Sequence, residues 1–129
     1  MIRISFINVD LELYSKEDLS SIASELKGRI YPLTNEYVDD VYNLAFECSM
    51  NDQEPSVVLE KFLALLDQLS DESALLLASC DKKIFDIGYD SGDDGFVSNN
   101  ISNELLRKVT ALGFDIKVTV YPISESDEQ

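Results

Sequence analysis

The apolar residues of this chain recur with two different periods, and this mixture constrains the fold more than any other feature. Some segments place an apolar side chain at every second position, which is typical of strands that bury one face. Other segments repeat apolar residues at spacings of three and four, which is typical of amphipathic helices. A chain of 129 residues with both patterns is predicted to form one α+β domain.

The two periods assign most of the chain. Four alternating segments predict strands, at residues 2–9, 42–48, 85–89 and 114–120. Three segments with helical spacing predict helices, caps included, at residues 15–28, 55–69 and 102–113. Ser15 and Asp18 fit a capping box at the first helix, and Ser102 is predicted to cap the third.

Two further segments lack a clear period. Residues 74–80 are apolar on both faces, which favours an interior strand that pairs with residues 85–89 as a hairpin. Residues 29–40 are predicted to be irregular, because Pro32 breaks a helix and the segment carries many polar residues.

These elements follow in the order β-α-β-α-β-β-α-β. The predicted fold is a mixed, mostly antiparallel five-stranded sheet with three helices packed on one face. We expect one domain over residues 1–123 and a frayed acidic tail over residues 124–129. The order of the strands in the sheet does not follow from the sequence. The predicted core includes Leu59, Phe62, Leu66, Leu106 and Val120.

The charges exclude several classes of function. The chain has 25 Asp and Glu against 10 Lys and Arg, a formal net charge of −15. Proteins that bind nucleic acid or anionic membranes need clusters of Lys and Arg, so we expect neither partner. The chain contains no histidine, which removes the commonest general base and metal ligand. We therefore predict that it is not an enzyme, and we expect no small-molecule substrate.

The cysteines and the N-terminus favour a cytoplasmic location. Cys48 and Cys80 form no paired motif, which favours free thiols in a reducing compartment over a disulfide. The N-terminus alternates from its start and lacks the basic and apolar regions of a signal peptide. The longest apolar runs are too short to span a bilayer.

The loop that begins at Asp90 is the best candidate for a metal site, and its sequence fails the test. Compared with a calcium-binding EF-hand loop, it has Gly92 at the third position and Ile101 at the twelfth. Both positions require a side-chain oxygen. The chain also lacks the glycine spacing of a phosphate-binding loop. We expect no metal ion and no cofactor.

Acidic residues cluster in predicted loops without neighbouring bases. Six acids and no base lie between Ile30 and Val58, and five acids and no base lie between Ile84 and Leu106. Loops often carry binding residues, and tyrosine beside carboxylates suits a protein interface. A solvated surface that only keeps the chain soluble is the alternative. The predicted partner-binding residues are Asp39, Asp40, Tyr42, Tyr89, Asp90, Asp93 and Asp94.

Three runs in the C-terminal half, at residues 85–92, 95–108 and 112–121, resemble the bacterial family called domain of unknown function 4279. The likeness covers about residues 55–122, and the first half matches only in the order of its elements. Members of that family are small cytoplasmic proteins. Several are immunity proteins of polymorphic toxin and contact-dependent growth-inhibition systems. No catalytic residue of the family is carried over to this chain.

The resemblance implies a non-catalytic immunity protein that binds and neutralises a cognate toxin C-terminal domain. Many such toxins are nucleases with a basic surface, which an acidic inhibitor would approach rapidly. One alternative is a general protein-interaction or ligand-sensing module without a toxin partner, and a toxin gene directly upstream would separate the two. Another is an enzyme that uses a carboxylate or a divalent ion, which would lose its function on chelation.

Overall fold

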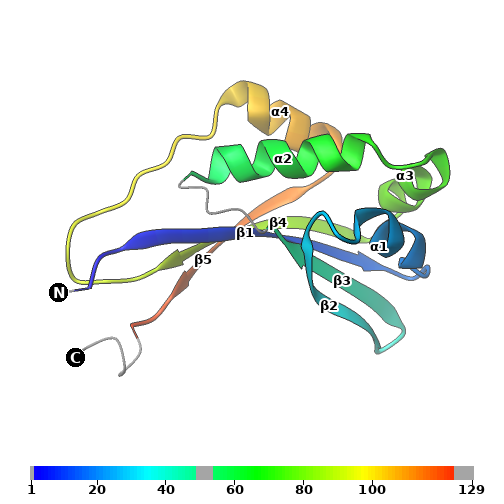
Figure 1. Ribbon diagram of the computed structural model, residues 1–129, viewed down its shortest axis with the longest axis horizontal. Coiled ribbons are helices and arrows are strands. Elements are labelled where there is room, and N and C mark those ends of the chain that lie inside the picture. The colour runs from blue at the N-terminus through cyan, green and yellow to red at the C-terminus, as the bar shows by residue number, and fades with distance from the viewer. Residues whose placement is uncertain (1, 49–53, 124–129) are drawn as a thin grey trace.

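The computed structural model describes residues 2–48 and 54–123, which form a five-stranded sheet and four helices (Figure 1). The strands are β1 (Ser5–Ser15), β2 (Tyr31–Val38), β3 (Val41–Glu47), β4 (Lys82–Asp90) and β5 (Asp115–Tyr121). The helices are α1 (Ser20–Leu26), α2 (Pro55–Asp67), α3 (Asp71–Ala78) and α4 (Asn103–Ala111). The predicted α+β class and mixed five-stranded sheet are confirmed. The predicted set of three helices and the order β-α-β-α-β-β-α-β are wrong, because the described residues follow the order β-α-β-β-α-α-β-α-β.

The sheet has the order β2-β3-β1-β4-β5, with β1 at its centre. β1 pairs antiparallel with both β3 and β4, and β2 pairs antiparallel with β3. β5 runs parallel to β4, to which α4 connects it. The predicted hairpin between residues 74–80 and β4 is wrong, because β4 pairs with β1 and β5, and residues 71–78 form α3.

One hydrophobic core lies between the sheet and the helices. Val9, Leu11 and Leu13 alternate along β1 and are fully buried. From the helix layer, the Phe62 ring of α2 packs against the Phe85 ring of β4 with centroids 5.7 Å apart. All four helices lie on this face of the sheet (Figure 1). No helix in the described ranges is long and apolar enough to cross a membrane.

Residues 71–78 form a helix where a strand was predicted. Ser70 caps α3 by accepting a hydrogen bond from the Ser73 backbone N–H at 3.2 Å. The segment consists mainly of Ala, Leu, Glu and Ser and has no β-branched residue, a composition that favours a helix. Only Ser73 and Leu77 are buried, at helical spacing, while Leu75 is 73% exposed. The run is apolar in composition but buries only one helical face.

Residues 31–38 form a strand where irregular structure was predicted. β2 is an edge strand, and its register with β3 shifts between Pro32 and Thr34. A proline lacks an N–H donor and is tolerated at such an edge or bulge. Asp39 and Asp40 close a two-residue hairpin to β3, and both have positive φ angles, 53° and 66°. Aspartate tolerates this left-handed backbone better than most residues, so these two carboxylates have a structural role in the turn.

The helix starts were predicted with mixed success. Ser102 caps α4 as predicted, accepting from the Leu105 backbone N–H at 3.1 Å. Ser15 instead ends β1 and accepts from the Glu17 backbone N–H. α1 begins one turn later than expected, where Asp18 accepts hydrogen bonds from Ser20.

The predicted core residues divide between buried and exposed. Leu59, Phe62 and Leu66 of α2 are at most 5% exposed, as predicted. Leu106 and Val120 are 37% and 60% exposed, so their assignment to the core is wrong. α4 turns Leu105 and Val109 toward the sheet, and the distal part of β5 extends beyond its cover.

We expect Phe62→Ala to lower the free energy of unfolding by about 3–5 kcal/mol, because it removes a buried aromatic ring that packs on Phe85. Leu106→Ala should cost about 1 kcal/mol or less, because its side chain is partly exposed. Urea denaturation of both variants measures the difference. Equal losses would show that the helix layer is packed differently.

Candidate functional site

The face of the sheet opposite the helices carries a concentration of acidic side chains. Along β1, Val9, Leu11 and Leu13 point to the helices, so the residues between them point away. Register extends this parity to the neighbouring strands. We call this surface the acidic face and define it by its four central carboxylates and one base: Asp10, Glu12, Glu47, Asp86 and Lys117.

Three of these carboxylates lie side by side in one row across the strands. Glu47 of β3 pairs with Asp10 of β1, Asp10 pairs with Asp86 of β4, and Asp86 pairs with Lys117 of β5. We call Glu47, Asp10 and Asp86 the carboxylate row. Residues directly opposite in an antiparallel pair have Cβ atoms only about 5 Å apart, and like charges there are destabilising. A surface selected only for solubility does not require this arrangement.

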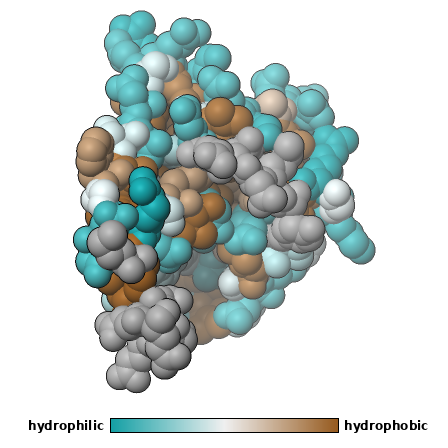
Figure 2. Space-filling model, turned by 60° about the vertical axis from the view of Figure 1, so that its left-hand side comes forward, coloured by the Kyte–Doolittle hydropathy of each residue, from teal (hydrophilic) through white to brown (hydrophobic). Residues whose placement is uncertain are grey.

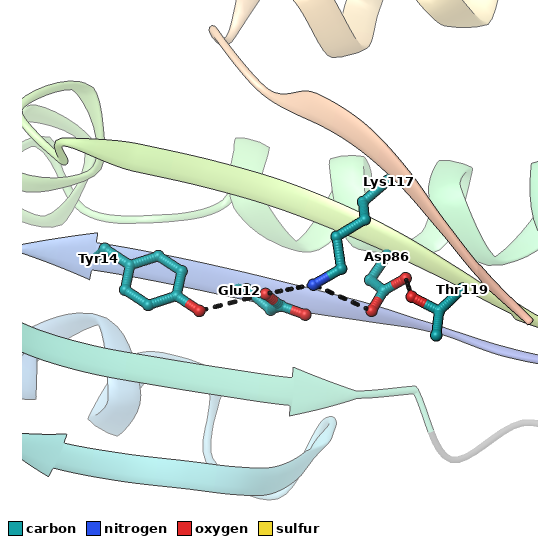
Figure 3. A network of polar contacts seen from close by, with 5 residues as sticks. All are labelled: Glu12, Tyr14, Asp86, Lys117 and Thr119. Atoms are coloured by element: carbon teal, nitrogen blue, oxygen red, sulfur yellow. Dashed lines mark hydrogen bonds and ion pairs between the residues drawn. The ribbon is translucent and has the colours of Figure 1, made fainter. Parts of the chain in front are cut away.

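Lys117 partly neutralises one end of the row (Figure 3). Its Nζ lies 3.6 Å from Glu12 Oε1 and 3.6 Å from Asp86 Oδ2. Asp86 is 6% exposed, and its Oδ1 also accepts a hydrogen bond from Thr119 Oγ1 at 2.7 Å. The negative charge of Glu12 raises the pKa of Lys117 above its usual value, so the ammonium stays charged and does not act as a base.

Asp10 at the centre of the row is the least satisfied carboxylate. Asn8 Nδ2 donates to Glu47 Oε2 at 2.7 Å, so Glu47 has a donor of its own. Asp10 Oδ1 is buried and accepts no hydrogen bond from the described residues. Burial, together with the charges of Glu47, Asp86 and Glu12, raises the pKa of Asp10 to about 6. The row therefore combines a dense negative charge with an acceptor that lacks a donor.

The acidic face offers carboxylate oxygens and negative charge. In the described part of the chain, no three His, Cys, Asp or Glu side chains are arranged to hold a metal ion. Tyr14 donates to Glu12 at 3.4 Å, and burial raises the pKa of this phenol, which keeps it neutral. Away from the face, Cys48 and Cys80 are free thiols, and burial raises the pKa of Cys80. These groups offer hydrogen-bond acceptors and negative charge rather than an activated nucleophile.

The sequence-predicted residues of the β2–β3 hairpin lie at one end of the sheet. Asp39 and Asp40 form the exposed turn. Tyr42 follows on β3 and packs against Tyr37 with ring centroids 4.4 Å apart. Tyr37 also donates a hydrogen bond to Asp40 Oδ1 at 3.2 Å. Tyr42 shares the helix side of the sheet with Leu44, so it does not lie on the acidic face.

The other predicted residues lie at the opposite end. Asp93 Oδ1 accepts a hydrogen bond from the Ile2 backbone N–H at 2.8 Å, and Asp94 pairs with Arg3 at 3.8 Å. The expectation that this loop lacks a neutralising base is therefore wrong, because Arg3 supplies one. Tyr89 packs on the helix side against Phe6 and donates to Asn99 at 2.7 Å.

The structure does not bring the seven predicted residues together. Tyr42 pairs with Ser15 and Asp90 pairs with Ser5, at the two ends of β1. At a rise of about 3.3 Å per residue, these ends are roughly 30 Å apart. Asp90 is exposed and has the same parity as Asp86, so it lies on the side of the sheet that carries the acidic face, whereas Tyr42 and Tyr89 lie on the helix side.

Sequence reasoning missed the carboxylate row because the row depends on strand order. Asp10, Glu47 and Asp86 come from three distant parts of the chain, and only the order β3-β1-β4 places them side by side. One signal was present. The alternation of Val9, Asp10, Leu11, Glu12 and Leu13 continues the first strand to Ser15, well past the predicted end at residue 9.

Comparisons with known protein families, with curated proteins and with solved structures found no match. The resemblance of about residues 55–122 to the domain of unknown function 4279 family therefore stays a prediction, as does the function that it implies.

We expect Asp10→Asn to stabilise the protein at neutral pH by about 1 kcal/mol, because it removes a partly buried charge. This energy is smaller than the one that corresponds to the full shift in the pKa of Asp10, since the site is partly solvated. The folded state holds the Asp10 proton more tightly than the unfolded chain. Protonated Asp10 therefore contributes fully to the free energy of unfolding below pH 3.8, and this contribution is lost as the pH rises through about 6. The gain from the variant should therefore fall by roughly half between about pH 8 and pH 5.

Urea denaturation across this pH range measures the gain. Glu36→Gln, which removes one exposed acid from the edge strand β2, is the matched control and should show little gain. A gain that is the same at every pH, or that equals the control, would contradict the raised pKa of Asp10.

Proposed function

We propose that this chain is a non-catalytic immunity protein that binds a basic toxin domain through the acidic face. The observation that carries the proposal is the carboxylate row, which gathers three like charges on a sheet face that no described helix covers. We further propose a cytoplasmic location, a protein partner in the form of a cognate toxin C-terminal domain, and no role for a cofactor, nucleic acid, membrane or small-molecule substrate.

Charge supports binding to a basic partner in two ways. The net charge of −15 gives the whole molecule a long-range attraction for a positive surface, which raises the association rate. At close range, the partly exposed carboxylates of Asp10, Glu12 and Glu47 offer acceptors to a lysine or arginine of the partner. Neutralising the row on binding would also relieve its internal repulsion, so part of the unfavourable energy in the free protein returns as affinity.

The same geometry favours inhibition by coverage over catalysis. A nuclease presents basic side chains to its substrate, and a complementary acidic face competes for that surface. Lys117, the base that contacts Glu12 and Asp86, lies on the edge strand β5. Asp10 and Glu47 have no base opposite them in the strand register, so a base of the partner can neutralise them.

We expect the Asp10→Asn, Glu47→Gln double variant to bind the toxin domain encoded directly upstream more slowly and with a flatter dependence on salt, because it weakens the long-range field that attracts a basic partner. The association rate should fall several-fold at low ionic strength. Biolayer interferometry with an immobilised, catalytically inactive toxin domain measures this rate. The variant should also protect cells less well from that toxin.

Two controls make the result specific. Glu72→Gln removes one exposed acid from α3, on the helix side, and should leave the rate nearly unchanged. Asp93→Asn with Asp94→Asn tests the loop expected from sequence. The proposal is wrong if the double variant associates at the parental rate with the parental salt dependence. Binding to a partner that is not toxic would favour a general interaction module instead.

A further inference from the structure

The edge strand β5 carries an apolar surface that the helix layer does not cover. Val118 and Val120 lie on the helix side of the sheet, in register with the core residue Ile87 and with Tyr89, yet both are 60% exposed. β5 ends the sheet, and no strand of the described residues pairs with its outer edge. In Figure 2, the end of the molecule at which β5 terminates faces the viewer, and hydrophobic residues lie at the surface among hydrophilic ones.

The two edges of the sheet differ in how they resist pairing. At the other edge, β2 contains Pro32 and a register shift beside it, two devices that block the addition of a strand. β5 contains neither a proline nor a register shift against β4. An exposed, regular strand with aliphatic side chains is a template for pairing with another strand.

We propose that two copies of this chain pair antiparallel through β5 and join their sheets into one continuous sheet across a two-fold axis at Val118. A two-fold axis makes the same patch meet itself, and two-fold dimers are the commonest homo-oligomers. The proposal stands on the edge strand alone and does not depend on the function proposed above.

The side chains of β5 suit an axis at Val118. It pairs Val118 with Val118 and Ile116 with Val120, so that aliphatic side chains meet on the helix side. On the other side it pairs Lys117 with Thr119 and Asp115 with Tyr121, so no like charges face each other. Moving the axis by one residue to Lys117 would place two ammonium groups directly opposite, which is destabilising.

Charge also explains why a second copy fits this edge of a strongly acidic protein. β5 carries one acid and one base, so the contact itself is locally neutral. The remaining repulsion acts between two chains of charge −15 and is screened by salt. Self-association should therefore strengthen with ionic strength, whereas binding to a basic partner should weaken. An interface of one strand pair is small and belongs to the class of weak complexes.

Sedimentation equilibrium of the full chain, over a range of concentrations at low and high salt, tests the proposal. We expect a monomer–dimer equilibrium that shifts toward dimer at high salt. Val118→Glu places two carboxylates opposite each other and should raise the dimer dissociation constant at least about tenfold. Leu75→Glu, at a leucine of α3 that is 73% exposed, is the control and should leave it unchanged.

A second measurement gives a gain of signal, which a variant that merely fails to fold would not produce. With Cys48 and Cys80 replaced by serine, Val118→Cys should be joined into covalent dimers by a short bis-maleimide, and Leu75→Cys should not. The proposal is wrong if the parent is a monomer under all conditions. It is equally wrong if Val118→Glu dimerises like the parent, or if the two cysteine variants cross-link equally.

Discussion

The alternation of β1 is the constraint on which the rest of the structure depends. Val9, Leu11 and Leu13 enter the core at 0% exposure, and the residues between them are therefore forced to the opposite face. Because β1 is the central strand and pairs with both β3 and β4, this single register also fixes which side chains of its neighbours join each face. The hydrophobic core and the acidic face are two consequences of one strand.

Magnitudes show why the fold tolerates the carboxylate row. Each like-charge pair across the strands costs up to about 1 kcal/mol, so Glu47–Asp10 and Asp10–Asp86 together cost about 2 kcal/mol or less. Burying a single aromatic ring such as Phe62 is worth more than that sum, at about 3–5 kcal/mol. Lys117, Thr119 and Asn8 reduce the cost further by direct contacts with three of the acids. Asp10 retains the largest share of the cost, because its buried Oδ1 accepts no hydrogen bond from the described residues.

Local patterns predicted the elements well where one face alone is buried. α2, α4, β4 and β5 appear where the periodicity placed them, and Ser102 caps α4 by the expected contact. Residues 74–80 were misassigned to a strand because the prediction rested on a short run that is apolar on both faces, whereas the Ala and Leu composition and the Ser70 cap favour the helix at residues 71–78. Residues 31–38 became a strand because β3 offered a free edge that accommodates Pro32. The carboxylate row required the strand order, which is a long-range property that no local pattern carries.

The central claim is that the carboxylate row brings like charges together around the partly buried Asp10, and the titration of Asp10 tests it most directly. Carboxyl carbon chemical shifts, followed by nuclear magnetic resonance from acid to neutral pH in the free protein, report the pKa of each aspartate separately. If Asp10 lies buried at the centre of the row, burial first and then the charges of Glu47 and Asp86 place its titration near pH 6, well above the ordinary value of 3.8. Titration of Asp10 at the ordinary value would contradict this arrangement of the row, and with it the proposal that the acidic face binds the partner.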